Sequence, residues 1–75
     1  MELLIRSLVK PLVDHPEDIQ VERREEGNKI VYHLLVNEDD IGKVIGKNGR
    51  VANAIRTIVY SANSDETKRV YLDIM

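Results

Sequence analysis

The stretch Ile45-Gly46-Lys47-Asn48-Gly49-Arg50-Val51-Ala52 decides the fold of this 75-residue chain. Two glycines enclose a basic and a polar residue, an aliphatic run precedes them, and a helical pattern follows them. Because glycine lacks a Cβ, Gly46 and Gly49 can reverse the chain tightly and let another backbone approach the main chain. We therefore predict a Gly-x-x-Gly loop between two helices, with Lys47 and Asn48 exposed at its tip.

The charge around this loop favours a phosphate partner. The net charge of the whole chain is −2, which by itself argues against nucleic acid, whose affinity depends on Lys and Arg. However, residues 41–60 hold four basic residues and no acidic one, whereas residues 14–27 hold six acidic and two basic residues. The helix that begins near Arg50 also offers free N–H groups and a positive dipole end to an anion. The alternative is that these charges form only a solvated face.

The rest of the chain predicts six elements in the order α-β-β-α-α-β, from apolar periodicities of 3.6 and 2 residues. The expected ranges are 2–13, 19–25, 30–36, 38–45, 50–63 and 69–75. Pro11 should break the last turn of the first helix, and residues 26–28 have the composition of a hairpin turn. Asn37 is suited to cap the helical segment that follows it, and residues 63–67 should form a polar loop.

The helix at 50–63 has more apolar surface than one face needs. We expect its buried stripe to consist of Val51, Ala54, Ile55, Ile58 and Ala62. Ala52, Val59 and Tyr60 then extend the apolar surface around the helix, which predicts a dimer interface. The alternative is that Ala52 and Val59 complete the core of a monomer.

Several classes of protein are unlikely from composition and spacing. The chain contains no Cys, which excludes disulfides and thiolate metal sites. His15 and His33 lack the spacing of a catalytic or metal-ligand group, and Asp39 and Asp40 are explained by the start of a helix. Asn48 stands where a nucleotide-triphosphate loop needs Ser or Thr. We expect no metal, no cofactor and no enzymatic activity.

Neither a signal peptide nor a transmembrane segment is apparent in the sequence. The apolar N-terminal segment contains Arg6 and Lys10, and no apolar run approaches the ~20 residues of a membrane-spanning helix. We expect a cytoplasmic protein with one domain over residues 1–75.

The element order and the stretch from Ile41 to Arg50 resemble the KH domain in its type II arrangement. Within that group the chain is most similar to the small bacterial KhpA-type proteins with a single KH domain. The shared segments are Val-Lys-Pro-Leu from Val9, Asp-Ile-Gly-Lys-Val-Ile-Gly-Lys from Asp40 and Ala-Ile-Arg-Thr-Ile-Val-Tyr from Ala54. The resemblance covers the whole chain and implies an α+β fold, with three helices packed on one face of a three-stranded sheet. Many KH domains have a large aliphatic residue at the position of Ala52, so the depth of the base-binding groove stays open.

The resemblance also implies a binding site for single-stranded RNA. In KH domains the Gly-x-x-Gly loop clamps about four nucleotides, and the bases lie against an aliphatic groove. The residues implied in RNA binding are Lys43, Ile45, Gly46, Lys47, Asn48, Gly49, Arg50 and Asn53. Ile41, Val51 and Ala54 either line the groove with Ile45 or belong to the core. Asn53 either reaches a base edge or is solvated.

Three classes of function follow. The first is an RNA chaperone or post-transcriptional regulator, for which the resemblance implies a partner KH protein of the KhpB (Jag, EloR) type and a role in cell-wall homeostasis, elongation and division. The partnership is either a homodimer or a heterodimer. The second class is a protein interaction module with RNA binding secondary, and the third is an enzyme.

Overall fold

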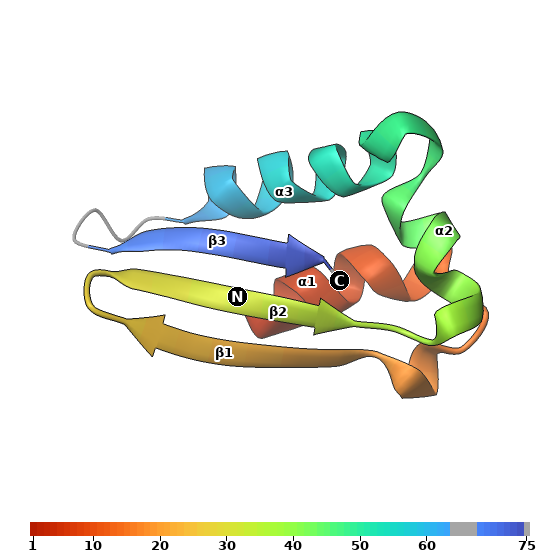
Figure 1. Cartoon of the computed structure of the whole chain (residues 1–75), viewed down its shortest axis with the longest axis horizontal. Coiled ribbons are helices and arrows are strands. Elements are labelled where there is room, and N and C mark those ends of the chain that lie inside the picture. Colours follow the sequence, from red (N-terminus) through yellow and green to blue (C-terminus); the bar gives the residue numbers. More distant parts are fainter. Residues whose placement is uncertain (64–67, 75) are drawn as a thin grey trace.

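Three strands form one mixed sheet with β2 at its centre (Figure 1). In the computed structural model, which describes residues 1–63 and 68–74, β1 (Gln20–Glu26) pairs antiparallel with β2 (Lys29–Leu35). β2 pairs parallel with β3 (Arg69–Ile74). Gly27 has φ +60° in the turn between β1 and β2, a conformation that glycine adopts without steric cost. The predicted hairpin and both of its strands are confirmed to within two residues.

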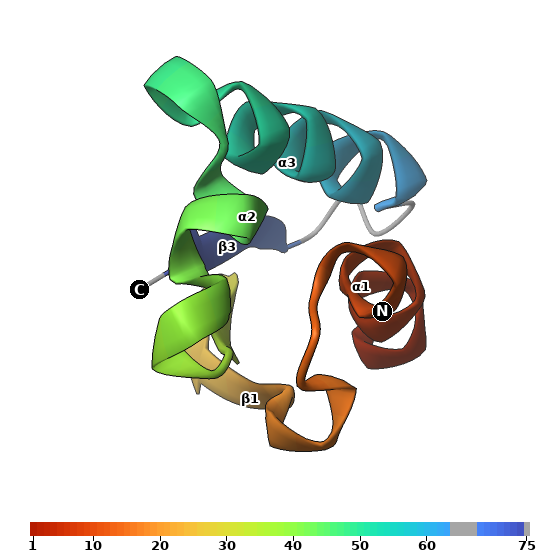
Figure 2. The same cartoon turned by 90° about the vertical axis from the view of Figure 1, so that its right-hand side faces the viewer.

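The helices α1 (Glu2–Val9), α2 (Ile41–Ile45) and α3 (Arg50–Ala62) all contribute to a core on one face of the sheet (Figure 2). This face of β2 presents alternate apolar residues, as its period of two predicts. Figure 1 looks onto the other face, which no helix of the described residues covers. The core consists mainly of Ile5, Val9, Val13, Ile19, Ile30, Tyr32, Leu34, Val44, Ile55, Val59 and Leu72. The predicted α+β fold and its element order are therefore confirmed.

Four short 3₁₀ turns complete the described chain. They are η1 (Lys10–Leu12), η2 (Pro16–Asp18), η3 (Glu38–Asp40) and η4 (Lys47–Gly49). The α-helical part of the first helix ends at Val9, earlier than the predicted residue 13, because Pro11 lacks the N–H that an α-helix needs. Asn37 caps η3 as predicted, since its Oδ1 accepts a hydrogen bond from the Asp39 N–H at 2.8 Å. The predicted polar loop at 63–67 lies, apart from its first residue, outside the described residues.

The prediction of which side of α3 faces the core is wrong. Ala52, Ile55 and Val59 face the core, whereas Ala54 and Ala62 are exposed and Ile58 is 45% exposed. At 3.6 residues per turn the predicted stripe is rotated roughly 70° from the observed one. Both stripes contain Ile55, so apolar periodicity alone did not separate them.

This rotation also corrects the predicted dimer interface. Ala52 and Val59 are 3% and 0% exposed within a single chain, so they complete its core and cannot contact a second molecule. Of the three predicted interface residues, only Tyr60 is exposed. None of the helices described is long and apolar enough to span a bilayer.

Candidate nucleic-acid interface

The loop between α2 and α3 has the tight geometry that its glycines predict. Gly46 ends α2 with φ +75° and ψ 176°, and its N–H donates to the carbonyl of Gly42 at 2.8 Å. Asn48 and Gly49 follow in left-handed conformations, with φ 58° and 74°. Three of the four loop residues thus have positive φ, and Lys47 and Asn48 are both exposed.

Gly46 must be glycine for two independent reasons. Its backbone conformation is one that residues with a Cβ almost never adopt. A Cβ at this position would also lie 2.4 Å from Val51 Cγ2 and 3.0 Å from the Val51 backbone nitrogen. The loop therefore doubles back directly against the first turn of α3.

The start of α3 adds a second feature suited to an anion. The Arg50 N–H donates to the carbonyl of Lys47, and no side chain caps the N–H groups that follow it in the first turn. Lys47 and Arg50, the cations nearest to this helix end in the sequence, form no ion pair with any described residue and are exposed. Free helical N–H groups, a positive helix dipole and two unpaired cations together favour a phosphate group at this place.

Lys43 has a different environment from the one its position in the sequence suggests. Its ammonium forms an ion pair with Asp14 and lies 3.8 Å from an oxygen of Asp40. The hydrogen bond to Asp14 raises the pKa of Lys43 above its ordinary value, although desolvation acts in the opposite direction. Lys43 is therefore engaged within the protein and is less available to a phosphate than Lys47 or Arg50.

Asp40 has a structural role that the sequence did not predict. Its carboxylate is fully buried and accepts hydrogen bonds from the backbone N–H groups of Asp14, at 3.0 Å, and His15, at 2.9 Å. Burial alone would raise the pKa of this carboxyl, but the two N–H donors and nearby positive charge outweigh burial and lower it. Asp40 thereby fixes the start of α2, and with it the loop, to the segment that follows α1.

The polar side of α3 contacts the free edge of β3. Arg56 Nε donates to the carbonyl of Leu72 at 3.2 Å, and the Leu72 N–H donates to the hydroxyl of Tyr60 at 3.3 Å. Arg56 also donates to Asn53 Oδ1 at 3.3 Å, so the amide of Asn53 is held by its neighbour one turn along the helix. These contacts hold α3 and the edge of β3 together beside the loop.

A partly exposed apolar strip lies beside the basic loop. Ile41, Ile45 and Val51 are half-buried, and Val51 also packs against the core, whereas Ala54 is exposed. The alternative that these residues belong to the core is therefore confirmed in part for Val51 and is wrong for Ala54. On α3 the strip continues to Ile58, because residues three and four apart are neighbours on a helix surface. This apolar surface next to free cations could hold nucleic-acid bases or a second protein.

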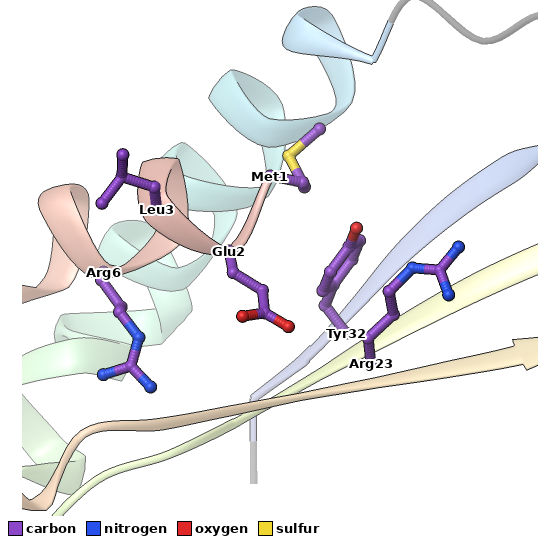
Figure 3. Close-up of a pocket in the computed structure, with 6 residues that line it drawn as sticks. All are labelled: Met1, Glu2, Leu3, Arg6, Arg23 and Tyr32. Atoms are coloured by element: carbon purple, nitrogen blue, oxygen red, sulfur yellow. The ribbon is translucent and has the colours of Figure 1, made fainter.

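A hollow elsewhere on the surface has no connection to this loop. It measures about 450 Å³ and lies between the start of α1 and the sheet (Figure 3). The carboxylate of Glu2 extends into it, with Arg6 and Arg23 on either side (Figure 3). Two arginines against one glutamate leave the hollow weakly positive, and no residue of α2, the loop or α3 lines it.

Among the described residues, the ring of each histidine lies near one carboxylate. His33 Nδ1 lies 2.9 Å from Asp73 Oδ2, and His15 Nδ1 lies 3.6 Å from Glu17 Oε1. Over residues 1–63 and 68–74, no three side chains of His, Cys, Asp or Glu converge in a way that could hold a metal ion.

Comparison with known proteins agrees with this geometry. The family model described as KhpA/KhpB, KH domain matches residues 2–74. A protein of Oceanobacillus iheyensis named RNA-binding protein KhpA is 60% identical over the full length of both chains. The proteins of that name from Listeria monocytogenes and Bacillus subtilis are each 51% identical; the matches cover 100% and 99% of this chain, and 99% and 91% of those proteins. The chain therefore belongs to the KhpA/KhpB family of KH domains.

Proposed function

We propose that this protein binds single-stranded RNA through the loop from Gly46 to Gly49, and that it acts as an RNA chaperone or post-transcriptional regulator in the cytoplasm. The observation that carries the proposal is the backbone of the loop, which turns back against Val51 and exposes Lys47 beside the uncapped start of α3. The relatives named RNA-binding protein KhpA support RNA binding by this chain.

The chemistry of binding follows from these parts. A phosphate sits against the N–H groups of the loop and of the first turn of α3, with Lys47 and Arg50 neutralising its charge. The bases extend over the part of the apolar strip nearest the loop, formed by Ile41, Ile45 and Val51, which leaves Ala54 and Ile58 further along α3 for a protein contact. The chain has three Tyr and no Phe or Trp, so contact with aliphatic side chains, rather than aromatic stacking, dominates at this site.

The test is a double substitution at the loop tip, Lys47→Asp with Asn48→Asp. It places two negative charges against the RNA phosphates, and both residues are exposed, so the fold should persist. We expect loss of binding to a labelled single-stranded RNA in an anisotropy titration, with an unchanged circular dichroism spectrum. A matched control is Ser7→Asp with Lys10→Asp, which changes the net charge by the same amount on exposed positions of α1 and η1. Retained affinity in the loop variant would show that the loop is not the contact site.

A second function, as a protein interaction module, is favoured by the exposed side of α3. Ile58 is a large apolar residue that is 45% exposed, and exposed Ala54 and Ala62 lie on the same side of the helix. Apolar surface of this kind on a small domain is often an interface. We propose that this side of α3 pairs with a second KH domain, either another copy of this chain or a KhpB-type protein.

Pairing would give one assembly two loops. Two weak RNA sites on one assembly bind more tightly than one, because the second contact forms at a high effective concentration. We propose that this assembly takes part in the control of cell-wall homeostasis, elongation and division, a role that the resemblance to KhpA-type proteins supports.

A further inference from the structure

The bare face of the sheet has an exposed aromatic residue among cations. Tyr71 is 42% exposed on this face of β3. The strand register pairs Tyr71 with Val31 of β2, and Val31 with Arg24 of β1, so these three residues form one row across the sheet. Lys29 of β2 pairs with Arg69 of β3 in the next row on the same face. Strands lie about 4.8 Å apart and alternate residues about 6.7 Å apart, so all three cations lie within about 10 Å of the tyrosine. We call Arg24, Lys29, Arg69 and Tyr71 the hairpin-end patch.

Most of the positive charge in this patch is unpaired. Within the described residues, Arg24 and Arg69 form no ion pair, whereas Lys29 Nζ lies 3.5 Å from Glu26. Lys29 Nζ also lies 5.9 Å from the centre of the Tyr71 ring. The two rows of the patch therefore hold three cations and one carboxylate, Glu26, whereas Glu22 and Asp73 lie in the next row.

The opposite end of the same face is acidic. The register places His33 between Glu22 of β1 and Asp73 of β3, and His33 bonds to Asp73 at 2.9 Å. The bare face is thus polarised along its strands, with its positive end at the hairpin. An anionic strand would be attracted to the hairpin-end patch and repelled from the other end.

We propose that the hairpin-end patch is a second contact site for single-stranded RNA, in which one base stacks on Tyr71 and its phosphates lie among Arg24, Lys29 and Arg69. Stacking on exposed aromatic side chains beside cations is the general way in which proteins hold single strands without strict sequence preference. Val31, half-buried, lies beside Tyr71 in the same row, with charged residues in the rows on both sides, whereas the core of a protein interface is depleted in charge. The inference rests on the proposed function, because it extends the path of the same RNA.

The fold provides a path between the two sites. α3 starts at the loop and returns along β3, to which Arg56 and Tyr60 attach it (Figure 1). Its 13 residues span about 20 Å, so the far end of α3 lies about that far from the loop. An RNA of four nucleotides, the length that a KH loop clamps, can occupy the loop alone, whereas a strand of about twelve nucleotides can reach both sites.

The test compares two lengths of oligouridine, of about four and about twelve nucleotides, with the whole chain. Tyr71→Ala with Arg69→Ala should weaken binding of the longer RNA about ten-fold, since loss of one stacked base typically costs this much. Binding of the shorter RNA should not change. The control Asp73→Ala with His33→Ala, at the acidic end of the same face, should not weaken either complex. Unchanged affinity of the Tyr71 and Arg69 variant for the longer RNA would overturn the proposal.

A second variant tests stacking directly and keeps this site separate from the loop. The chain has no Trp, so Tyr71→Trp introduces a single fluorescent reporter. We expect the longer RNA to quench its emission and the shorter RNA not to. Absence of quenching by a longer RNA that binds would overturn stacking at this residue. If the loop variant Lys47→Asp with Asn48→Asp abolishes the shorter complex but the longer RNA at high concentration still quenches the reporter, the two sites are independent. Failure of the shorter RNA to bind the unmodified protein would instead count against the loop site.

Discussion

Val51 occupies the space that a side chain on Gly46 would need. A Cβ on Gly46 would approach Val51 Cγ2 to 2.4 Å. Rotation of the Val51 side chain would not relieve this overlap, because the Val51 backbone nitrogen would also lie only 3.0 Å from the added Cβ. The loop and the first turn of α3 are therefore packed together as one unit. Any substitution that separates them should affect both stability and RNA binding.

Gly46→Ala should lower the free energy of unfolding, because it combines this overlap with a backbone conformation that costs a residue with a Cβ about 1–3 kcal/mol. Urea denaturation measures the loss. The matched control is Gly42→Ala in α2, where no atom lies within 4 Å of the added Cβ and φ is not positive. Alanine there should stabilise the protein by about 0.5–1 kcal/mol, because glycine is a poor helix former. Equal stability of the two variants would contradict the observed loop.

The buried carboxylate of Asp40 should make the protein sensitive to acid. Its pKa is lower in the folded state than its ordinary value of 3.8, so its contribution to stability is present above that value and is lost as the pH falls through the folded pKa. Asp40→Asn should therefore lower stability at pH 7 and reduce the further loss on acidification. Asp39→Asn, at an exposed position one residue away, is the control and should behave like the unmodified protein. Urea titrations at several pH values measure both effects. If the free energy of unfolding of the Asp40→Asn variant fell with pH as steeply as that of the unmodified protein, Asp40 would not be the source of the acid sensitivity.

The salt dependence of RNA binding should be shallow. If all three to five cations near the loop in the sequence neutralised phosphates, the slope of log affinity against log salt would be about −2 to −4, at roughly 0.7 per neutralised phosphate. Because Lys43 and Arg56 are engaged within the protein, Lys47 and Arg50 alone should give about −1.4 for the shorter RNA. Affinity titrations over a range of salt concentrations measure this slope. A slope steeper than about −3 for the shorter RNA would mean that Lys43 and Arg56 leave their partners on binding.

Ile58→Asp should convert a dimer into a monomer without unfolding it, because Ile58 is half-exposed and its side of α3 has no partner within the described chain. Val59→Asp should instead unfold the protein, because Val59 is completely buried and a carboxylate at this position would lose its hydration without gaining a partner. Thr57→Asp, which alters an exposed neighbour, is the control. Sedimentation equilibrium at tens of micromolar, with circular dichroism for folding, separates these outcomes. A monomeric mass for the unmodified chain would exclude self-pairing and leave pairing with another KH protein.

The fold was predictable from the sequence because its determinants are local. The glycines around Lys47 define the loop, and the alternation from Ile30 to Leu34 defines the central strand, each within a few residues. The rotation of α3 was not predictable in this way. The predicted and the observed buried stripes of α3 share Ile55. Which of the two faces the core depends on how the loop fixes the rotation of the helix about its axis.

The electrostatic details of the site were also beyond local patterns. Asp40 was correctly placed at the start of a helical segment, but its burial depends on backbone groups 25 and 26 residues earlier in the chain. Lys43 was expected to face RNA, yet its partner Asp14 is 29 residues away in sequence. Contacts of this kind become apparent only when the segments before β1 and after β2 are placed side by side.

The most direct test of the central claim is a chemical-shift titration of the ¹⁵N-labelled protein with an RNA of about four nucleotides. If the loop clamps the RNA backbone, the largest changes should occur at the backbone amides from Gly46 to Val51, with smaller changes along the exposed side of α3. The account would be contradicted if these amides did not shift while others, such as those of β1, did.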